Sequence, residues 1–496
     1  MKKICFAFCL LLVELGFSQD ISGKIVDAKT SEPIPFVTIQ YGKNEGVVSN
    51  TEGNFSFYAA QSQGDVELTT SAMGYLSQTV TLKKLREKNH IIRLSEALNQ
   101  LSTVYVSNQR PNADSIMQRV RKNLPSNYIS GNTKYKLFKR QSSFFKPSSV
   151  EIEIEKSTGF NKSQLQQSNQ QLQKLSNDVT NRPPAQRYID MLCNLYNQDS
   201  ENQKIEIIKA TKLLDINNKV SFENIQKKAS TIILRHLDTT KTYKLKSGLF
   251  TLEEKMSLTE TNQIKEEIEE DQKIIPADVR KKMAQTIQEF MFDSPEKMDF
   301  ITEPKYYEYE LDEISDFNGN LVYVVSFIPD RRKAKYEGKI YISNEDYAIL
   351  KIEYSFAEGK SGEKLNLKFL LGIKYAEDIQ SGTIIYTKNE KLNSYFPKYI
   401  NQESGSYIYV HRPLKFIENN ASEKNKVAFD FMIEGHVMEK NELLLLETTA
   451  LDTSEFQVFS EAPTDEYQLL NAYDASIWTN INTLEPLKEM REFKVE

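Results

Sequence analysis

The sequence predicts a mainly β protein with helical insertions, an α+β fold. Short runs of alternating apolar and polar residues recur from Ile21 to Leu94, with turn residues between them, which is typical of an antiparallel sandwich. Longer runs of the same kind return after Tyr306 and indicate a curved antiparallel sheet. Between these regions the apolar residues follow helical spacing or give way to polar stretches. We therefore expect a sandwich, a helical middle region and a β-meander.

The first region, residues 19–107, is expected to form one sandwich. Ile21 to Asp27 alternates as a strand, and Pro33 and Pro35 then exclude a helix and remove ladder donors, so the chain must turn at a sheet edge. Val37 to Gln40 follows as the second strand. The remaining runs with strand character are Gly46 to Ser49, Phe55 to Tyr58, Val66 to Thr70, Gln78 to Leu82 and His90 to Leu94. Their inward apolar side chains would fill a single core.

Four motifs in this region carry a family resemblance. They are Gly23-Lys24-Ile25-Val26-Asp27, Glu32-Pro33-Ile34-Pro35-Phe36-Val37-Thr38-Ile39, Gly53-Asn54-Phe55-Ser56-Phe57 and Met73-Gly74-Tyr75. Together they resemble the carboxypeptidase regulatory-like domain. The resemblance implies a seven-stranded transthyretin-like sandwich at the front of an exported protein of Gram-negative envelopes. The resemblance is to the noncatalytic domain that is attached to metallocarboxypeptidases. It therefore specifies the fold better than an activity.

The N-terminus has the pattern of a secretory signal peptide. Lys2 and Lys3 precede an apolar run from Ile4 to Val13, and Gly16-Phe17-Ser18 provides small residues at the third and first positions before a cut. We expect residues 1–18 to be removed. Cys193 would then be the only cysteine, so no intramolecular disulfide could form. The predicted location is outside the cytoplasm, in the periplasm or associated with the outer membrane.

The charge of the chain argues against a nucleic-acid partner, and its hydropathy argues against a transmembrane helix after the signal peptide. The net charge is -6, whereas nucleic-acid binding requires clustered lysine and arginine side chains, so we expect no nucleic-acid partner. After the signal peptide no segment is apolar enough for a transmembrane helix, since the run Leu443 to Leu446 is far too short. We expect no transmembrane segment in the mature chain.

Residues 108–300 are expected to be a mixed helical region with a Gln/Asn-rich insertion. Asn112 should cap a helix from Ala113 to Asn123, which Pro125 would end. Ser163 to Gln203 is expected to be a loosely packed helical or loop insertion. Glu253 to Lys273 is expected to be a solvated helix face or a linker. A further helix should begin at Pro276 and pack on a sheet through Val279, Met283, Ile287 and Phe290.

Residues 301–496 are expected to be an antiparallel β-meander with a C-terminal tail. The strand candidates are Tyr306 to Leu311, Leu321 to Ile328, Tyr336 to Ile342, Ala348 to Phe356, Leu365 to Tyr375, Gly382 to Lys388, Ser406 to Val410, Val427 to Ile433 and Leu443 to Thr448. The phrase Tyr336-Glu337-Gly338-Lys339-Ile340-Tyr341-Ile342, followed by Asp346-Tyr347-Ala348-Ile349, is similar to the half-barrel of periplasmic lipoprotein carriers. From Tyr473 onward we expect a polar tail that clasps the rest of the chain.

The sequence nominates no catalytic, cofactor-binding or metal-binding residue. His436 and Glu439 have the spacing of two zinc ligands, but a catalytic zinc needs a third and no histidine follows His436. Residues three apart on a strand also face opposite sides of the sheet. Asp316-Phe317-Asn318-Gly319-Asn320 lacks the later glutamate of a calcium loop and is better explained as a hairpin turn. Apolar neighbours of Cys193 predict a buried, inert thiol.

Three functions remain open, in order of preference. The first is a noncatalytic exported envelope protein that acts as a binding or structural module, with an envelope protein or a glycan as its partner and no cofactor. The second is a periplasmic carrier of a lipid or another apolar ligand in a C-terminal half-barrel. The third is a hydrolase whose catalytic residues the sequence does not reveal.

Overall fold

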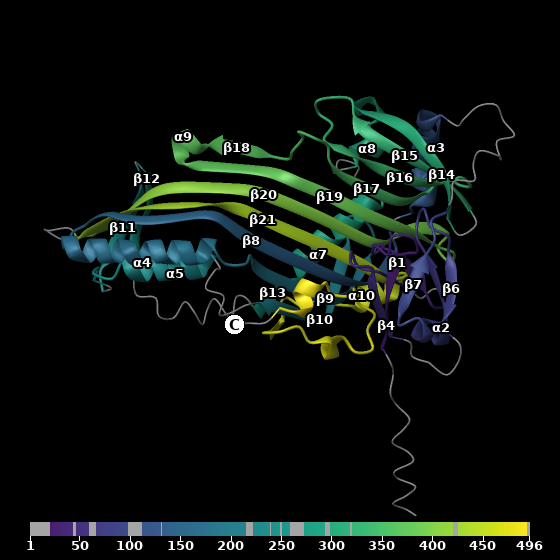
Figure 1. Ribbon diagram of the computed structural model, residues 1–496, viewed down its shortest axis with the longest axis horizontal. Coiled ribbons are helices and arrows are strands. Elements are labelled where there is room, and N and C mark those ends of the chain that lie inside the picture. The colour runs from purple at the N-terminus through teal and green to yellow at the C-terminus, as the bar shows by residue number, and fades with distance from the viewer. Residues whose placement is uncertain are drawn as a thin grey trace, which may run out of the picture.

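The computed structural model describes residues 20–42, 46–58, 66–97, 112–129, 131–214, 222–238, 240–248, 250–257, 272–292, 298–317, 320–419 and 425–493. The expected signal peptide, residues 1–18, lies outside them. The fold is mainly β, as expected, with a small N-terminal sandwich at one end of a long curved sheet (Figure 1). Across the described ranges, no helix is both long and apolar enough to cross a bilayer.

Within its described residues the N-terminal sandwich has seven strands, the number that the family resemblance implies. They are β1 (Asp20–Asp27), β2 (Thr38–Gln40), β3 (Gly46–Val48), β4 (Asn54–Tyr58), β5 (Glu67–Ser71), β6 (Gln78–Thr81) and β7 (Ile91–Leu94). One sheet has the order β4-β1-β7 and the other β3-β2-β5-β6. Phe55 and Phe57 alternate with half-buried neighbours and fill the core between the sheets, as the period of two requires. A short helix, α2 (Leu82–Glu87), was not expected, and Thr81 caps it.

Most of the remaining strands form one sheet of 14 strands. Eleven of them follow the order β14-β15-β16-β17-β19-β20-β21-β8-β9-β10-β23, and the other three, β11, β12 and β18, pair along the edges of this sheet. Their bounds are β8 (Thr133–Ser157), β9 (Ala185–Asn197), β10 (Gln203–Leu214), β11 (Thr242–Ser247), β12 (Phe250–Ser257), β14 (Tyr307–Phe317), β15 (Asn320–Pro329), β16 (Tyr336–Ser343), β17 (Ile349–Phe356), β18 (Lys364–Leu367), β19 (Ile373–Asn389), β20 (Ser394–Glu418), β21 (Lys426–Ala450) and β23 (Gln468–Leu470). A separate pair joins β13 (Lys273–Ile274) to β22 (Asp465–Glu466).

Three central strands, β8, β20 and β21, are each 25 residues long and run most of the length of the molecule (Figure 1). Several expected strands are therefore fragments of longer ones. Val427 to Ile433 and Leu443 to Thr448 both belong to β21, and Ser406 to Val410 is the middle of β20. By contrast, the expected strand Leu365 to Tyr375 is interrupted by a helical turn, α9 (Lys368–Leu371), which Gly372 ends with a positive φ of 63°.

The expected helical character of residues 108–300 is corrected by six strands in the described part of this region, β8 to β13. β8, β9 and β10 lie in this region and form much of the sheet that continues after residue 301. Ser163 to Gln203 contains the capped helix α4 (Lys162–Thr180), and then β9, which is buried on both faces and so lacks alternation. Glu253 to Ser257 lies in β12 rather than in a helix, and residues 258–271 lie outside the described ranges.

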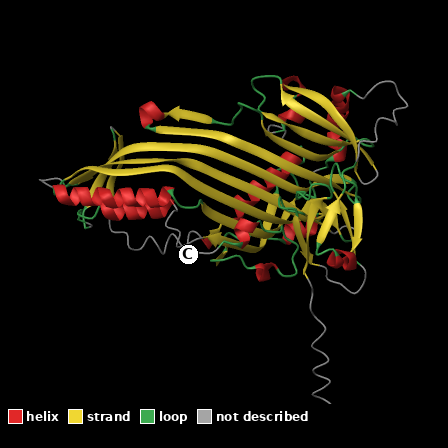
Figure 2. Cartoon of the chain, in the orientation of Figure 1, coloured by secondary structure: helices red, strands yellow, loops and turns green. Residues whose placement is uncertain are grey.

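Helices cover one face of the long sheet at two separate places (Figure 2). At one end, α3 (Ala113–Asn127), α7 (Pro276–Phe290) and α8 (Asp299–Thr302) share a core with Leu443 and Leu445 of β21. At the other end, α4 and α5 (Phe222–Ile233) share a core with Phe429 and Ile433 of the same strand. All four β21 residues are odd-numbered, and β20 pairs with β21 without a bulge, so both helix groups lie on one face. We call it the helix face.

The predicted helix that begins at Pro276 and packs on a sheet is confirmed. Pro276 occupies its first turn, and Met283, Ile287 and Phe290 are buried against the sheet. The predicted end of the helix that follows Asn112 is wrong. Pro125 lies inside α3, which continues to Asn127. Tyr128 explains the extension, because its hydroxyl oxygen lies 2.7 Å from both the Ile349 carbonyl oxygen and the Ile349 amide nitrogen and fixes the last turn on β17.

The opposite face, which we call the sandwich face, carries the N-terminal domain and the C-terminal tail. Val48 of the sandwich and Trp478 of the tail share a core with Phe138 and Leu444 of the long sheet. Trp478 packs edge-on to Phe138, with ring centroids 5.2 Å apart. The tail contains α10 (Thr453–Val458), the 3-10 turn η3 (Ala475–Trp478) and α11 (Lys488–Arg491). Its buried Trp478, Leu484 and Met490 show that it is not simply polar.

Candidate functional site

The C-terminal tail holds the sandwich against the long sheet through hydrogen bonds. The Tyr58 amide donates to Asn482 Oδ1 at 2.8 Å, and Asn482 Nδ2 donates to the Tyr41 hydroxyl at 2.6 Å. The Ser56 hydroxyl donates to Glu485 Oε2 at 2.5 Å. These contacts satisfy polar groups that the junction removes from water, so the sandwich is fused to the sheet rather than suspended from a linker.

Beneath this junction lies a buried ion pair. Arg140 Nε and Nη2 donate to the two carboxylate oxygens of Asp190 at 2.8 and 2.7 Å, and Arg140 Nη1 donates to the Leu484 carbonyl at 3.0 Å. Burial alone would lower the pKa of Arg140, but the facing Asp190 carboxylate more than offsets it and the pKa is raised. The guanidinium therefore stays charged and bound, which fits a role in fixing the tail rather than in proton transfer.

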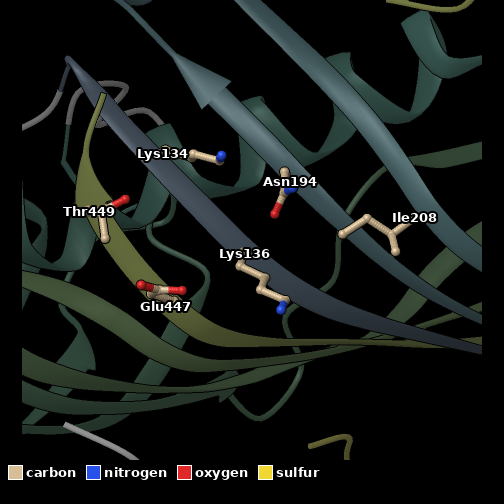
Figure 3. A pocket seen from close by; sticks show the side chains of 6 residues that line it. All are labelled: Lys134, Lys136, Asn194, Ile208, Glu447 and Thr449. Atoms are coloured by element: carbon tan, nitrogen blue, oxygen red, sulfur yellow. The ribbon is translucent and has the colours of Figure 1, made fainter. Parts of the chain in front are cut away.

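A pocket with a volume of about 280 Å³ opens on the sandwich face beside the tail (Figure 3). It is lined by Lys134, Lys136, Asn194, Ile208, Glu447 and Thr449. Lys134 Nζ lies 2.5 Å from Glu455 Oε1 and 4.8 Å from the Tyr196 ring centroid. Partial burial lowers the pKa of Lys134, but its bonds to Glu455 and Tyr196 outweigh this effect and the pKa is raised.

The pocket has a polar lining in which charges of both signs are present. Its Lys136 and Glu447 are directly opposite each other on paired strands, so their charges balance. Asn194 donates to Glu206 Oε2 at 2.7 Å, so that carboxylate is already engaged. The lining offers ammonium, carboxylate, amide and hydroxyl groups, which can form hydrogen bonds with a polar ligand.

Between the two helix groups, both faces of the long sheet are only partly covered. We call this stretch, residues 402–409 of β20 and 434–440 of β21, the open span. His436 and Met438 are exposed on the sandwich face, and Val437 is exposed on the helix face. An antiparallel sheet normally buries at least one face, so a stretch with two accessible faces indicates a contact surface.

Side chains on the sandwich face of the open span are held in a network across three strands. The Tyr407 hydroxyl donates to Glu434 Oε1 at 2.6 Å, and His436 Nε2 lies 2.9 Å from Asp378 Oδ2. Lys374 Nζ lies 4.8 Å from the Tyr407 ring centroid. Desolvation and then the Glu434 carboxylate raise the pKa of Tyr407 to about 12. The phenol therefore remains a neutral donor at physiological pH, and the network forms a fixed polar and aromatic surface.

The candidates weighed from the sequence do not assemble into a catalytic site. His436 and Glu439 lie on opposite faces of β21, and Glu439 accepts a hydrogen bond from Asn441 at 2.6 Å. Over the described residues, no group of three or more His, Cys, Asp or Glu side chains is placed to hold a metal ion. Cys193 is fully buried with its Sγ 3.5 Å from Met283 Sδ, which confirms that the thiol is buried, and burial raises its pKa to about 12.

Sequence reasoning missed the open span because its signal is not local. Tyr407 and Glu434 are 27 residues apart, and His436 and Asp378 are 58 apart. Only the register between β19, β20 and β21 brings them together. The sequence marks the open span only by a missing pattern. The stretch Glu434 to Asn441 lacks the apolar alternation that a buried sheet face would show.

Comparison with known proteins assigns the sandwich. Residues 21–106 match the CarboxypepD_reg-like domain family, as the motifs in this region indicated. No curated protein matches the chain. A putative outer membrane lipoprotein-sorting protein domain from Vibrio parahaemolyticus is 9% identical over 70% of this chain and 97% of its own, with a TM-score of 0.18. A putative membrane-associated protein of unknown function from Bacteroides fragilis is 9% identical over 86% and 98%, with a TM-score of 0.12. Neither score indicates a shared fold.

Proposed function

We propose that the mature chain is a noncatalytic exported binding protein of the cell envelope, and that the open span is the surface that binds a protein partner. The observation that carries this proposal is the exposure of three consecutive residues, His436, Val437 and Met438, which present side chains on both faces of the sheet among mostly half-buried neighbours. Side chains there combine aromatic, apolar and charged groups, which is the composition of protein interfaces. Among the described residues, none of the three best-formed pockets is lined by the open span, which favours a protein over a glycan as the partner.

The fused sandwich supports this role by making the molecule rigid. Trp478 and Asn482 tie the sandwich to the same sheet that carries the open span. A binding surface on a rigid sheet loses little conformational entropy when a partner docks. We infer that the regulatory-like domain stabilises one end of the sheet, while the open span makes the contact.

The alternative of a carrier for an apolar ligand would need an apolar cavity inside the curved sheet. Side chains of α3, α7 and α8 occupy the concave side at the end where the sheet curls most, and Phe290 and Phe300 are fully buried there. The pocket found in this region, beside Tyr135 and Ile287, has a volume of only about 10 Å³. An acyl chain would have to displace these helices, so the binding-protein proposal is preferred.

Photo-crosslinking tests the proposal directly. A photoreactive phenylalanine analogue at position 438, in the open span, should give a discrete protein adduct in intact envelopes. The matched control is position 458, where the valine is 84% exposed on α10, far from the open span. Equal adducts at both positions, or none at 438, would reject the open span as the interface.

A separate assay addresses the hydrolase alternative. The purified mature chain should show no turnover on panels of peptide, ester and glycoside substrates, with and without added zinc. Turnover that survives further purification would overturn the noncatalytic proposal.

A further inference from the structure

At the end of the sheet away from the sandwich, β20 brings two peripheral hairpins together. The His411 amide donates to the Gly372 carbonyl at 2.7 Å, which places α9 beside β20. Three residues further along β20, Leu414 pairs with Ser247, the last residue of β11. That separation is about 10 Å along a strand. Figure 1 shows α9 and β12 projecting near each other from this end. We call residues 242–257, 364–374 and 411–417 the tip.

The tip exposes large apolar side chains. Phe369 is 100% exposed and Leu370 is 76% exposed, both on α9. On β12, Phe250 and Leu252 are 58% and 57% exposed. Leaving one such side chain in water is ordinary, but several on adjoining hairpins at one extremity mark an interaction surface.

Cationic side chains lie on the same segments as this apolar group. The tip contains eight lysine and arginine residues: Lys244, Lys246, Lys255, Lys364, Lys368, Lys374, Arg412 and Lys415. Residues 242–248, 364–374 and 411–417 contain no aspartate or glutamate, and the two acids of the tip, Glu253 and Glu254, lie on the outer strand β12. Beside the tip, Asp430 of β21 lies 3.9 Å from His411 Nε2. The concentration of positive charge contrasts with the net charge of -6 for the whole chain.

We propose that the tip docks on the surface of an anionic lipid bilayer. Phe369 and Leu370 insert at the boundary between headgroups and acyl chains, and the lysine and arginine side chains of the tip contact lipid phosphates. Both parts are needed: a few apolar side chains bind a bilayer only marginally, and each cation near an anionic surface adds about 1 kcal/mol. The bilayer end of the molecule is then opposite the fused sandwich.

Charge argues against the other occupants of this surface. A second copy of the chain docking through the same tip would bring eight cations and two acids of each molecule against the same set on the other, which is repulsive. An anionic membrane matches both the charge and the apolar centre. Lys374 also contacts Tyr407 of the open span, but the substituted residues Phe369 and Leu370 lie outside the open span, so either proposal can fail without the other.

Vesicle co-sedimentation with the full mature chain tests the docking. The chain should bind vesicles of phosphatidylcholine with one quarter phosphatidylglycerol and should bind pure phosphatidylcholine vesicles much less. Binding to the anionic vesicles should weaken as the salt concentration rises. The double substitution F369S/L370S should weaken binding by roughly tenfold to a hundredfold, because it removes two inserted side chains. V458S, an equally exposed apolar site on α10, should bind as the parent does.

A second measurement places the side chain itself. The chain has a single tryptophan, buried Trp478, so F369W adds one reporter at the tip. Brominated acyl chains should quench its fluorescence in anionic vesicles and leave Trp478 unquenched. Equal binding to neutral and anionic vesicles, parental binding by F369S/L370S, or no quenching of F369W would overturn the proposal. Concentration-dependent dimers that F369S/L370S abolishes, without vesicle binding, would assign the tip to a second copy instead.

Discussion

The same long strands run through both ends of this molecule, but the elements that cover the sheet differ between the two ends. At the head, which comprises the sandwich, the C-terminal tail, α3, α7 and α8, the long sheet is covered on both faces. At the arm, which comprises the far halves of β8, β20 and β21 with α4 and α5, it is covered only on the helix face. The tip has exposed aromatic and leucine side chains. Since β20 and β21 pair without interruption through both, hydrogen bonding along the ladder does not distinguish the ends.

The difference shows that burial, rather than strand pairing, divides this chain into a closed part and an accessible part. Strand ladders satisfy backbone groups equally in both, but stability comes mainly from apolar area removed from water. We therefore expect substitutions in the head to change the free energy of unfolding, and substitutions in the open span and tip to change binding.

The largest effect should come from breaking the buried ion pair of the head. R140A leaves Asp190 charged and buried without its partner, and should cost about 3–5 kcal/mol of unfolding free energy. Urea denaturation measures this loss. The control R140M/D190L removes both charges and should recover most of it. A loss below about 1 kcal/mol for R140A would show that the head is less closed than its packing indicates.

A second effect in the head depends on pH. Burial lowers the pKa of Lys398 to about 8 from an ordinary value of 10.5, and its ammonium donates to the Leu445 carbonyl at 2.9 Å. Between pH 8 and 10.5 the unfolded state binds more protons than the folded state, so this lysine makes stability rise with pH.

The variant K398M should remove that rise. It should also be more stable than the parent below pH 8, by on the order of 1–3 kcal/mol, because the cost of burying the charge disappears. Unfolding measured from pH 7 to 9.5 for both proteins gives the difference curve. A difference that does not change with pH would contradict the assignment.

A smaller effect tests the attachment of the sandwich. N482A loses the bonds to the Tyr58 amide and the Tyr41 hydroxyl and should cost about 1–2 kcal/mol. Limited proteolysis should then release the sandwich faster than in the parent. T464A, at an exposed position of the same tail, is the matched control and should change stability by less than about 0.5 kcal/mol.

The smallest effect on stability is expected at the tip. F369S/L370S removes side chains that are exposed in the folded chain, so the free energy of unfolding should change by less than about 0.5 kcal/mol. Thermal unfolding of the double variant measures this. A large loss would mean that these side chains are packed in solution, and the contrast between head and tip would fail.

The sequence predicted the sandwich well because each of its strands is short, alternates and ends at a turn residue. Pro33, Pro35 and Gly53 mark bends, and Gly53 has a φ of 74° with its Cβ position only 2.4 Å from the Ile25 carbonyl oxygen, so this position requires glycine. Phe55 and Phe57 face the core as their spacing indicated. Local chemistry and tertiary packing agree throughout this region.

The long sheet was predicted less well for two physical reasons. In β9, Met191, Leu192 and Cys193 are consecutive and all buried, because both faces are covered, so no period of two remains. In β21 the opposite holds: Glu434 to Asn441 has little apolar character because neither face is fully covered, so one strand was predicted as two. The open span and the tip depend on cross-strand register and exposure, which a single sequence does not encode locally.

Hydrogen–deuterium exchange of the full mature chain, with and without anionic vesicles, tests the contrast between the ends most directly. We expect slow exchange in β8, β9 and β20 of the head in both samples. Vesicles should add protection only at residues 242–257 and 364–374 of the tip. Protection that appears instead in the sandwich or the tail, or fast exchange throughout the head, would contradict it.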